Sequence, residues 1–589
     1  MIEPEDSEAS LLPRGSLLRF GLGLVAALAT FTVFLPALGN GFIDWDDGSL
    51  LLRNPWYRGL GPANLAWMVT TVRMGHWMPL NWLSFGLDYE IWSLRPFGYH
   101  LTNVLLHAGA VAAFFGVARR LLRAALLPRG ADIRWLDVGA LAAALAWGIH
   151  PLRVESVAWV TERRDVLSGI FFLLSLLAYL RWVESRAARQ YWVALGCFAL
   201  ALMSKSITAT LPGVLLVLDV YPLRRLGDRA GWFGPVARRI LIEKLPFVAL
   251  SVTAVAVAVW AVASGGGLTP LAALDAPARG ALSVYAASFY LAKIFWPSRL
   301  SPLYELVLPV APLQLRFLVG ALAVVGVTVV AVSWRRRWPW LLATWAVFVL
   351  MLLPVLGLAH NGYQLAADRY TYLPGLGWAV CAGGLVVRFR RPAAMALALV
   401  LVVSSVFTWR QIGVWRSDES LWRHAVSLDP ASGIARSNLG AALTAGQRYP
   451  EAVAELERAV VRRPGYAEAW NNLGLALVGA RRTADALEAF RRAVSVRPRF
   501  AEAWNNLGVT LAVEGRPEPA KEAFTRAAAA DPAMAEARNN LGLALAEDGK
   551  VAEAAEQFKR AVELNPTWVD PRRNLEQALR LLGREQRVR

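Results

Sequence analysis

The sequence predicts an all-α protein in two parts, a polytopic bundle of membrane helices followed by an α-solenoid of helical repeats. Two observations lead to this prediction. Hydrophobic residues make up 56% of the 589 residues and the mean hydropathy is +0.39, values typical of a chain that crosses a membrane several times. Proline recurs every 34 residues, but only near the C-terminus, at Pro430, Pro464, Pro498, Pro532 and Pro566.

The N-terminal segment predicts an uncleaved first membrane helix. Residues 1–17 are expected to form a cytoplasmic tail, and Arg14 and Arg19 precede an apolar run from about Phe20 to Leu38. This run is too long for the core of a secretory signal and lacks a basic opening region. We therefore expect it to cross the membrane.

Ten further apolar runs bring the predicted number of spans to eleven, within a membrane domain at 18–408. Connections rich in arginine alternate with connections poor in arginine, and the positive-inside rule places the former in the cytoplasm. The odd number of spans then puts the N-terminus inside and the repeats outside, in the periplasm of a bacterial inner-membrane protein. One more apolar segment, 281–296, breaks the alternation, so we expect it to be re-entrant or to lie on the outer interface. The ten runs lie near 101–118, 136–149, 166–182, 190–203, 208–220, 245–264, 316–333, 338–357, 374–386 and 392–408.

The positive charge of the chain is concentrated in the membrane part. Of the 62 Lys and Arg residues 35 precede Arg410, against only 21 of the 44 Asp and Glu residues. Cytoplasmic loops of membrane proteins account for such an excess, so the net charge of +18 does not indicate a nucleic-acid partner. The two cysteines, Cys197 and Cys381, lie in apolar stretches and imply neither a disulfide framework nor a thiolate metal site.

The 34-residue interval is the period of the tetratricopeptide (TPR) repeat, a helix-turn-helix unit. Small residues at fixed positions allow the two helices to approach each other, and large residues fill the seam with the next repeat. We expect four repeats over 433–566, after a linker and first amphipathic helix at 409–432 and before a capping helix at 567–589. The second and third repeats carry the motif at matching positions, Trp470, Leu473, Gly474, Ala486, Phe490 and Ala493, then Trp504, Leu507, Gly508, Ala520, Phe524 and Ala527.

Asparagine follows the same interval, once per repeat. An Asn amide both donates and accepts hydrogen bonds, so a row of them on the concave face can bind the backbone of an extended peptide. This row resembles the asparagine ladder of O-GlcNAc transferase. The alternative is that these residues only bind neighbouring helices. The five residues are Asn438, Asn472, Asn506, Asn540 and Asn574.

The first outward loop holds three carboxylates within four residues, Asp44, Asp46 and Asp47. Carboxylates are costly to place at a membrane boundary. Such a cluster can supply a general base or hold a divalent cation that neutralises a phosphate leaving group. The alternative is a solvated acidic loop that caps a helix.

Three later outward connections contribute cations. His150, Glu155, Arg164 and Asp165 lie together in the second one, where arginine could bind a phosphate and a carboxylate or histidine could orient the acceptor. The alternative is a charged turn with internal ion pairs. Lys205 is a lone cation between apolar runs. The alternative to a role in the site is that its side chain snorkels to the lipid headgroups.

The last outward connection reads Ala367 to Gly375 and places Arg369 next to Tyr370 and Tyr372. An arginine flanked by aromatic residues could hold a lipid phosphate, although an aromatic-belt anchor is the alternative. Acids in one loop and bases in three others are what a lipid-phosphate-linked donor requires: the acids act on the acceptor hydroxyl and the bases stabilise the departing phosphate.

Together with the repeats, these motifs resemble the transmembrane-and-TPR-containing (TMTC) O-mannosyltransferase family over about residues 38–580. The resemblance rests on Asp46-Asp47, His150-Pro151 with Glu155, Arg164-Asp165-Val166-Leu167, Ser204-Lys205 and Ala367 to Pro374. The family implies a GT-C fold, a polyprenyl- or dolichyl-phosphate sugar donor, and transfer to Ser or Thr hydroxyls on the outer side of the membrane, with the TPR array holding the acceptor protein.

The resemblance also implies roles for individual residues. The catalytic candidates are Asp46, Asp47, His150 and Glu155, with Asp47 chosen as the general base. The candidates for donor phosphate binding are Arg164, Asp165, Lys205, Arg369, Tyr370 and Tyr372. Asp44 and Asp46 are candidate ligands of a divalent metal, and whether a metal is needed stays open.

The predicted function is therefore transfer of mannose or another hexose from a polyprenyl-phosphate to a hydroxyl acceptor. Two other classes stay open: a non-enzymatic membrane scaffold that recruits partners through its repeats, and a transporter or polymerase of lipid-linked sugars. Eleven spans with charged outward motifs are more than a simple anchor requires. The sequence identifies neither the sugar nor the acceptor.

Overall fold

The computed structural model describes residues 14–227, 231–264, 274–357 and 362–588, and most of the predicted N-terminal tail lies outside these ranges. The chain divides into two compact units, Met1–Ser417 and Asp418–Arg589. Most of the described residues are helical and very few lie in strands, which confirms the all-α prediction.

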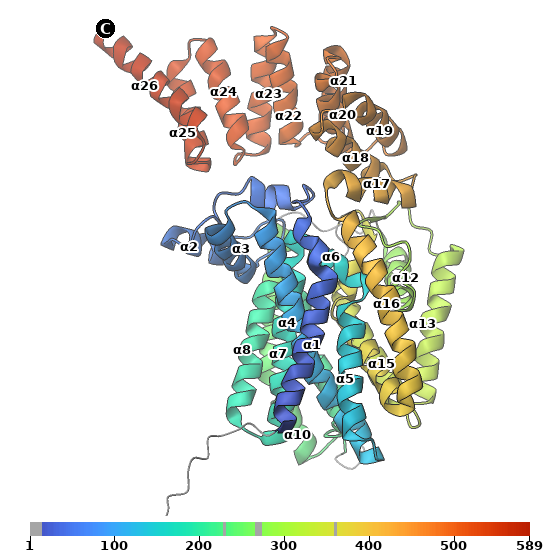
Figure 1. The fold of residues 1–589 in the computed structure, drawn as a ribbon. Coiled ribbons are helices and arrows are strands. Elements are labelled where there is room, and N and C mark those ends of the chain that lie inside the picture. The colour runs from blue at the N-terminus through green and yellow to red at the C-terminus, as the bar shows by residue number, and fades with distance from the viewer. Residues whose placement is uncertain (1–13, 228–230, 265–273, 358–361, 589) are drawn as a thin grey trace, which may run out of the picture. The chain divides into compact units, whose positions relative to one another are not determined.

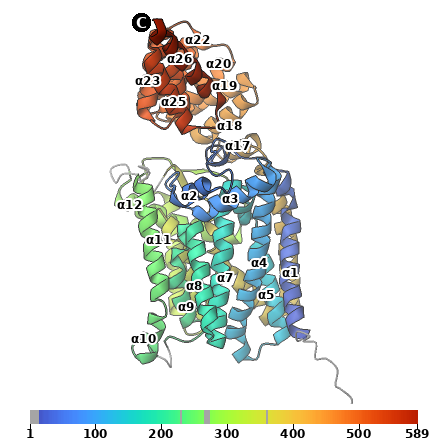
Figure 2. The same cartoon turned by 90° about the vertical axis from the view of Figure 1, so that its left-hand side faces the viewer.

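Long helices that run side by side make up the first unit (Figures 1 and 2). Each of the eleven predicted apolar runs lies on one of them. Their bounds are α1 Arg14–Phe34, α4 Pro96–Leu126, α5 Ile133–Gly148, α7 Arg163–Ser185, α8 Ala188–Ser204, α9 Leu211–Val220, α11 Leu245–Ser264, α13 Leu315–Ser333, α14 Pro339–Leu352, α15 Gly375–Phe389 and α16 Arg391–Val414.

Fewer helices meet the length and composition of a membrane span than the eleven predicted. Among the described residues six helices do so, or seven if α5 and the short helix after it, bent by 56°, form one broken span. Three shorter apolar helices cover 206–220, 339–355 and 375–389. The lower count arises because several apolar runs end in turns before they reach the length of the bilayer core. The chain is an integral membrane protein, and its orientation remains a prediction.

Smaller elements connect these helices. The segment 281–296 lies on α12, Ala276–Phe295, which packs against α13 and is not among the candidate spans. Two short antiparallel strands, β1 Tyr304–Glu305 and β2 Gln364–Ala366, join the loop after α12 to the loop before Arg369. The remaining helices of this unit are α2 Pro62–Thr70, α3 Pro79–Trp92, α6 Val154–Ala158 and α10 Pro235–Ile242.

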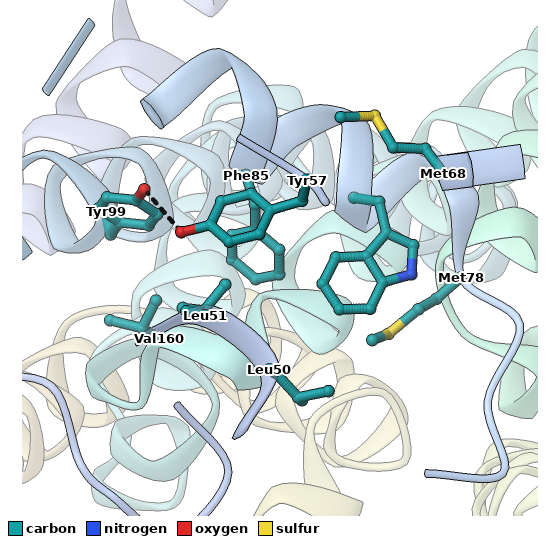
Figure 3. Packing of buried hydrophobic residues seen from close by; sticks show 9 residues of the cluster. Leu50, Leu51, Tyr57, Met68, Met78, Phe85, Tyr99 and Val160 are labelled. Atoms are coloured by element: carbon teal, nitrogen blue, oxygen red, sulfur yellow. Dashed lines mark hydrogen bonds between the residues drawn. The ribbon is translucent and has the colours of Figure 1, made fainter. Parts of the chain in front are cut away.

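An aromatic core anchors the loop that follows α1 (Figure 3). Tyr57 packs with Trp82 and Phe85 of α3 and with Tyr99 of α4, and the hydroxyls of Tyr57 and Tyr99 lie 3.3 Å apart. Leu50, Leu51 and Val160 belong to the same buried cluster. Burying several large aromatic side chains contributes much of the stability of such a core. The core therefore fixes the chain that directly follows the acidic residues.

The second unit is a run of helix pairs that ends in a long helix. A Cβ atom on Gly508 would lie 2.6 Å from Cε1 of Phe524, and Gly474 and Gly542 meet Phe490 and Phe558 in the same way. Only glycine allows the two helices of each repeat to approach this closely. The helices are α17 Asp418–Leu428, α18 Gly433–Ala445, α19 Tyr449–Arg462, α20 Ala467–Gly479, α21 Thr483–Val496, α22 Ala501–Val513, α23 Pro517–Ala530, α24 Ala535–Glu547, α25 Val551–Leu564 and α26 Val569–Val588.

The boundary between the two units differs from the predicted one. α16 continues to Val414, past the predicted end of the membrane domain at 408, and the repeat unit begins at Asp418. The apolar pattern fades before the helix ends because its last turns include Arg410 and Gln411. Hydropathy alone therefore places the end of this helix too early.

Candidate active site

The acidic loop begins where α1 ends. A 3-10 turn, Leu35–Gly39, follows α1. The next two residues, Asn40 and Gly41, form hydrogen bonds with residues near the C-terminal end of the first unit. The side-chain amide of Asn40 donates to the carbonyl of Ile412 (3.2 Å), and the backbone N–H of Gly41 donates to the carbonyl of Arg416 (3.0 Å). The loop is thus fixed to the C-terminal end of α16 before it reaches its carboxylates.

Asp47 is an internal anchor of this loop. Its side chain is fully buried, one carboxylate oxygen accepts the N–H of Ile43 (2.9 Å) and the other accepts the N–H of Thr161 (3.1 Å). Burial raises the pKa of Asp47 to about 7, against the opposing effect of these two donors. Because both oxygens are occupied and excluded from solvent, the geometry does not support our choice of Asp47 as the general base.

Asp46 is placed differently. Its residue is partly exposed, and within the described part of the chain its carboxylate accepts no hydrogen bond. Desolvation raises the pKa of Asp46, while the nearby charges of Arg164 and Arg369 lower it and that of Glu162 raises it. Asp46 is therefore an accessible carboxylate next to a charged cluster, the placement that a general base requires.

The residues around Asp46 do not fit a bound metal. Asp44, the other proposed ligand, pairs with Arg53 at 3.2 Å, and both side chains are more than half exposed. Over the ranges that the structure describes, no group of three or more His, Cys, Asp or Glu side chains is arranged to hold a metal ion. The suggestion of a divalent metal at Asp44 and Asp46 is therefore not supported.

A buried carboxylate that the sequence analysis missed, Glu162, is the centre of the charged cluster. It ends the short 3-10 turn Val160–Glu162, just before α7, and has no exposed surface. Its oxygens meet the side chains of three cations, Arg164 through Nε at 3.1 Å, Lys205 through Nζ at 3.2 Å and Arg369 through Nε at 3.2 Å. Glu162 therefore gathers cations from three distant parts of the sequence.

Two further carboxylates orient these cations. Glu155 accepts the backbone N–H of Arg369 (2.8 Å) and pairs with its guanidinium, which also donates to Gln364 (2.9 Å). Asp165 accepts from Lys205 at 2.6 Å. Glu155 is thus a buried partner of Arg369, and its contacts do not support the catalytic role that we proposed for it.

Of the two candidate tyrosines only Tyr370 lies at the cluster. Its partly exposed ring lies under the guanidinium of Arg369 (5.0 Å) and the ammonium of Lys205 (5.9 Å). Tyr372 is buried, and its hydroxyl lies 2.8 Å from Nδ1 of His107. The proposed contact of Tyr372 with the donor is therefore not supported by the structure.

His150 stabilises a turn. Its Nδ1 accepts the backbone N–H of Leu152 (3.2 Å), so Nε2 carries the proton and donates to the carbonyl of Ile294 (3.0 Å). Both ring nitrogens are thus used in hydrogen bonds. These bonds assign His150 a structural role in the turn, and its catalytic role stays a prediction.

Two other titratable residues near the cluster were also missed. Asp368, next to Arg369, accepts from the hydroxyl of Tyr304 (2.9 Å), and burial raises its pKa to about 8. His76 lies in the turn between α2 and α3, where desolvation and the charges of Arg164 and Lys205 lower its pKa to about 3. Sequence offers a signal only for Asp368, which lies inside the Ala367 to Gly375 motif.

The row of asparagines in the repeats is bonded across repeat boundaries. The amide nitrogens of Asn506, Asn540 and Asn574 each donate, at 2.9 Å, to an asparagine in the preceding repeat, and Asn472 donates to Ser437 (3.3 Å). The helix-binding alternative therefore accounts for the donors of four of the five residues. In the described residues, the side-chain oxygens of Asn472, Asn506 and Asn574 accept no hydrogen bond.

Known proteins are similar to both parts of the chain. The tetratricopeptide repeat model matches residues 419–467, 471–520 and 514–567. Protein O-mannosyl-transferase Tmtc1 of Drosophila melanogaster is 28% identical over 559 residues, which cover 76% of this chain and 62% of that protein. TMTC4 of Mus musculus is 25% identical over 480 residues, 72% of this chain and 64% of that protein. The chain thus matches less than two thirds of the length of these curated relatives.

Solved structures of TPR proteins are similar to part of the chain. MamA is 26% identical over 25% of this chain and 86% of that protein, with a TM-score of 0.23. A thermophilic TPR protein of Thermus thermophilus is 22% identical over 31% of this chain and 96% of that protein, with a TM-score of 0.25. The TMTC proteins, by contrast, are homologues over much of the chain, as the sequence motifs predicted.

We predict that Glu162→Gln destabilises the first unit. Loss of this charge leaves three buried cations with less compensation, and breaking a buried ionic network costs about 3–5 kcal/mol. The unfolding temperature of the full chain in detergent should fall clearly. Glu419→Gln is the matched control, since Glu419 pairs with Arg423 and Arg448 on an exposed surface and should change little. An unchanged unfolding temperature for Glu162→Gln would show that the cluster does not stabilise the fold.

Proposed function

From its homology to the TMTC protein O-mannosyl-transferases, we propose that this chain is a membrane glycosyltransferase. It transfers a hexose, mannose by analogy with these relatives, from a polyprenyl-phosphate to a Ser or Thr hydroxyl of a protein. One observation carries the proposal: the accessible carboxylate of Asp46 lies beside the cations gathered by Glu162. A base for the acceptor and positive charge for the departing phosphate are the two requirements of this reaction.

The proposed reaction moves one proton and exchanges one bond. Asp46 takes the proton of the acceptor hydroxyl while the hydroxyl oxygen forms a bond to the anomeric carbon of the sugar. The bond between that carbon and the phosphate oxygen breaks, and the electron pair leaves with the lipid phosphate. The additional negative charge on this phosphate is stabilised by Arg164, Lys205 and Arg369, which the cluster already holds in position.

The carboxylates around the cations have a positioning role in this proposal. Glu155, Glu162 and Asp165 hold the cations close together despite their mutual repulsion. Asp47 holds the loop that carries Asp46 by its bonds to Ile43 and Thr161. No step depends on a metal. The donor substrate is the lipid-linked sugar itself, and Tyr370 is placed to contact it beside Arg369 and Lys205.

The repeats are proposed to hold the acceptor protein. Since the amide nitrogens of most in-phase asparagines already bind the neighbouring repeat, the available groups are the oxygens of Asn472, Asn506 and Asn574. Carbonyl oxygens accept from the backbone N–H groups that every extended peptide offers, whatever its side chains. The predicted orientation, with the repeats and the acidic loop on the outer side, belongs to the same proposal.

Substitutions of Asp46 and Asp47 should distinguish the general base from the residue that anchors the loop. Asp46→Asn should lower turnover with a lipid-phosphate sugar by about 100-fold or more, with an unchanged unfolding temperature, because the general base is lost. Asp47→Asn should lower both, since an amide N–H would then face a backbone N–H, a loss of about 1–3 kcal/mol.

The exposed Asp44→Asn is the control and should retain turnover. Transfer assays with membranes that contain each variant provide the measurement. Normal turnover of Asp46→Asn would sink the catalytic assignment.

The pH dependence should follow the titration of Asp46. Burial raises the pKa of this carboxyl, and only its ionised form accepts a proton, so the rate should fall as pH decreases through a pKa above the ordinary value of about 3.9. The measurement is kcat/KM for the acceptor against pH. A rate that stays constant down to the ordinary pKa of aspartate would contradict the role of Asp46.

Removal of two in-phase asparagine amides should weaken acceptor binding. Asn472→Ala with Asn506→Ala is expected to raise KM for an unstructured Ser/Thr-rich peptide several-fold, since each hydrogen bond contributes about 1 kcal/mol, while kcat stays unchanged. Asn565→Ala, outside the row, is the control. An unchanged KM for the double variant would restrict the asparagines to binding between repeats.

A further inference from the structure

Three tryptophans from separate parts of the first unit form a stack beside the candidate site. The rings of Trp45 and Trp159 lie 5.0 Å apart and nearly parallel, at 17°. Trp159 also stacks on Trp415, at 5.4 Å and 27°. Trp45 belongs to the acidic loop, Trp159 lies between α6 and the turn that carries Glu162, and Trp415 directly follows α16.

The central indole of this stack, Trp159, contacts Arg369 and the residue that precedes Asp46. The guanidinium of Arg369 lies 5.5 Å from the ring centroid of Trp159, a cation–π contact. Its stacking partner Trp45 directly precedes Asp46 in the chain. The orientation of Trp159 therefore affects the base and the phosphate-facing cation together.

The segment that carries Trp415 is bonded to the acidic loop at two more points. Ile412 accepts from the side chain of Asn40, and Arg416 accepts from the N–H of Gly41. Trp415 and Trp159 are nearly fully buried, and within the described residues their indole N–H groups have no hydrogen-bond partner. A buried donor without a partner costs about 1–3 kcal/mol. Ring packing is thus retained here at the expense of hydrogen bonding.

We infer that Trp415 is a positioning residue for the transfer reaction, which sets Asp46 relative to Arg369 through the stack Trp415–Trp159–Trp45. This inference rests on the proposed function. The chain enters the repeat unit at Asp418, shortly after Trp415, so a displacement of this connecting segment reaches the site through the stack. The geometry of the site thus depends on the segment that joins the acceptor-holding repeats to the membrane unit.

The test compares Trp415→Ala, which opens a gap in the stack, with Trp415→Phe, which keeps an aromatic ring. We expect Trp415→Ala to lower kcat about tenfold while KM for the lipid-linked sugar changes by less than about twofold, since small displacements of reacting groups reduce turnover strongly. Trp415→Phe should recover most of the loss. Trp192→Ala is the control, because Trp192 is 65% exposed and lies outside the stack.

Two further readouts separate positioning from a general loss of stability. In Trp415→Ala the acidic loop should exchange its backbone hydrogens faster, notably at Gly41 and Asp47, whose N–H groups are bonded in the wild type. Better hydration of Asp46 should also move the acid limb of the pH profile to lower pH, because desolvation is what raises its pKa.

The outcomes distinguish this inference from the proposed function. A wild-type chain that transfers no sugar from a lipid phosphate overturns the proposed function and the inference with it. If the wild type is active and Trp415→Ala has the same kcat and pH profile, the inference is overturned and the proposed function stands. The same conclusion follows if Trp415→Phe is as impaired as Trp415→Ala and neither variant shifts the pH profile, since that result describes a structural role only.

Discussion

The candidate site depends on the buried carboxylate of Glu162, which forms ion pairs with three cations. Taking Glu162 and its partners out of water costs several kcal/mol per ion, and only close, complete pairing offsets that cost. The arrangement therefore holds together only when Arg164, Lys205 and Arg369 all reach Glu162. These residues come from the start of α7, the turn after α8 and the loop before α15, so the network fixes the relative positions of three distant segments.

Apolar contacts give this network its frame. The aromatic core of Tyr57, Trp82, Phe85 and Tyr99 fixes the chain just after the acidic residues. Val160 of the same core stands two residues before Glu162, so the core and the ionic network share one short segment. A site that must keep charges at fixed distances benefits from such rigid support, because small displacements weaken electrostatic stabilisation of a transition state.

The sequence was sufficient for features that depend on local pattern. Apolar runs located the helices, and the alternation of small and large residues located the repeats, because Gly508 and Phe524 occupy positions that every repeat must fill in the same way. Asp46 and Asp47 were also found from local pattern, because they are neighbours in the sequence. Which of Asp46 and Asp47 is accessible could not be predicted, since buried Asp47 accepts a hydrogen bond from Thr161, which is remote in sequence. The bonds of His150 and Tyr372 could not be predicted for the same reason, because their partners Ile294 and His107 are equally remote in sequence.

The charges of the cluster bear on the barrier of the proposed reaction. Three cations face the carboxylates of Glu155, Glu162, Asp165 and Asp46, and Asp46 is the one side chain of the four that is partly exposed and not hydrogen-bonded within the described residues. Proton transfer from the acceptor neutralises Asp46, while the lipid phosphate gains one charge as it leaves. The total charge is conserved and moves from a desolvated carboxylate toward a phosphate near Arg164, Lys205 and Arg369. Desolvation makes the carboxylate of Asp46 a stronger base, and the cations stabilise the charge that develops on the phosphate, so both effects lower the barrier to transfer between the bound substrates.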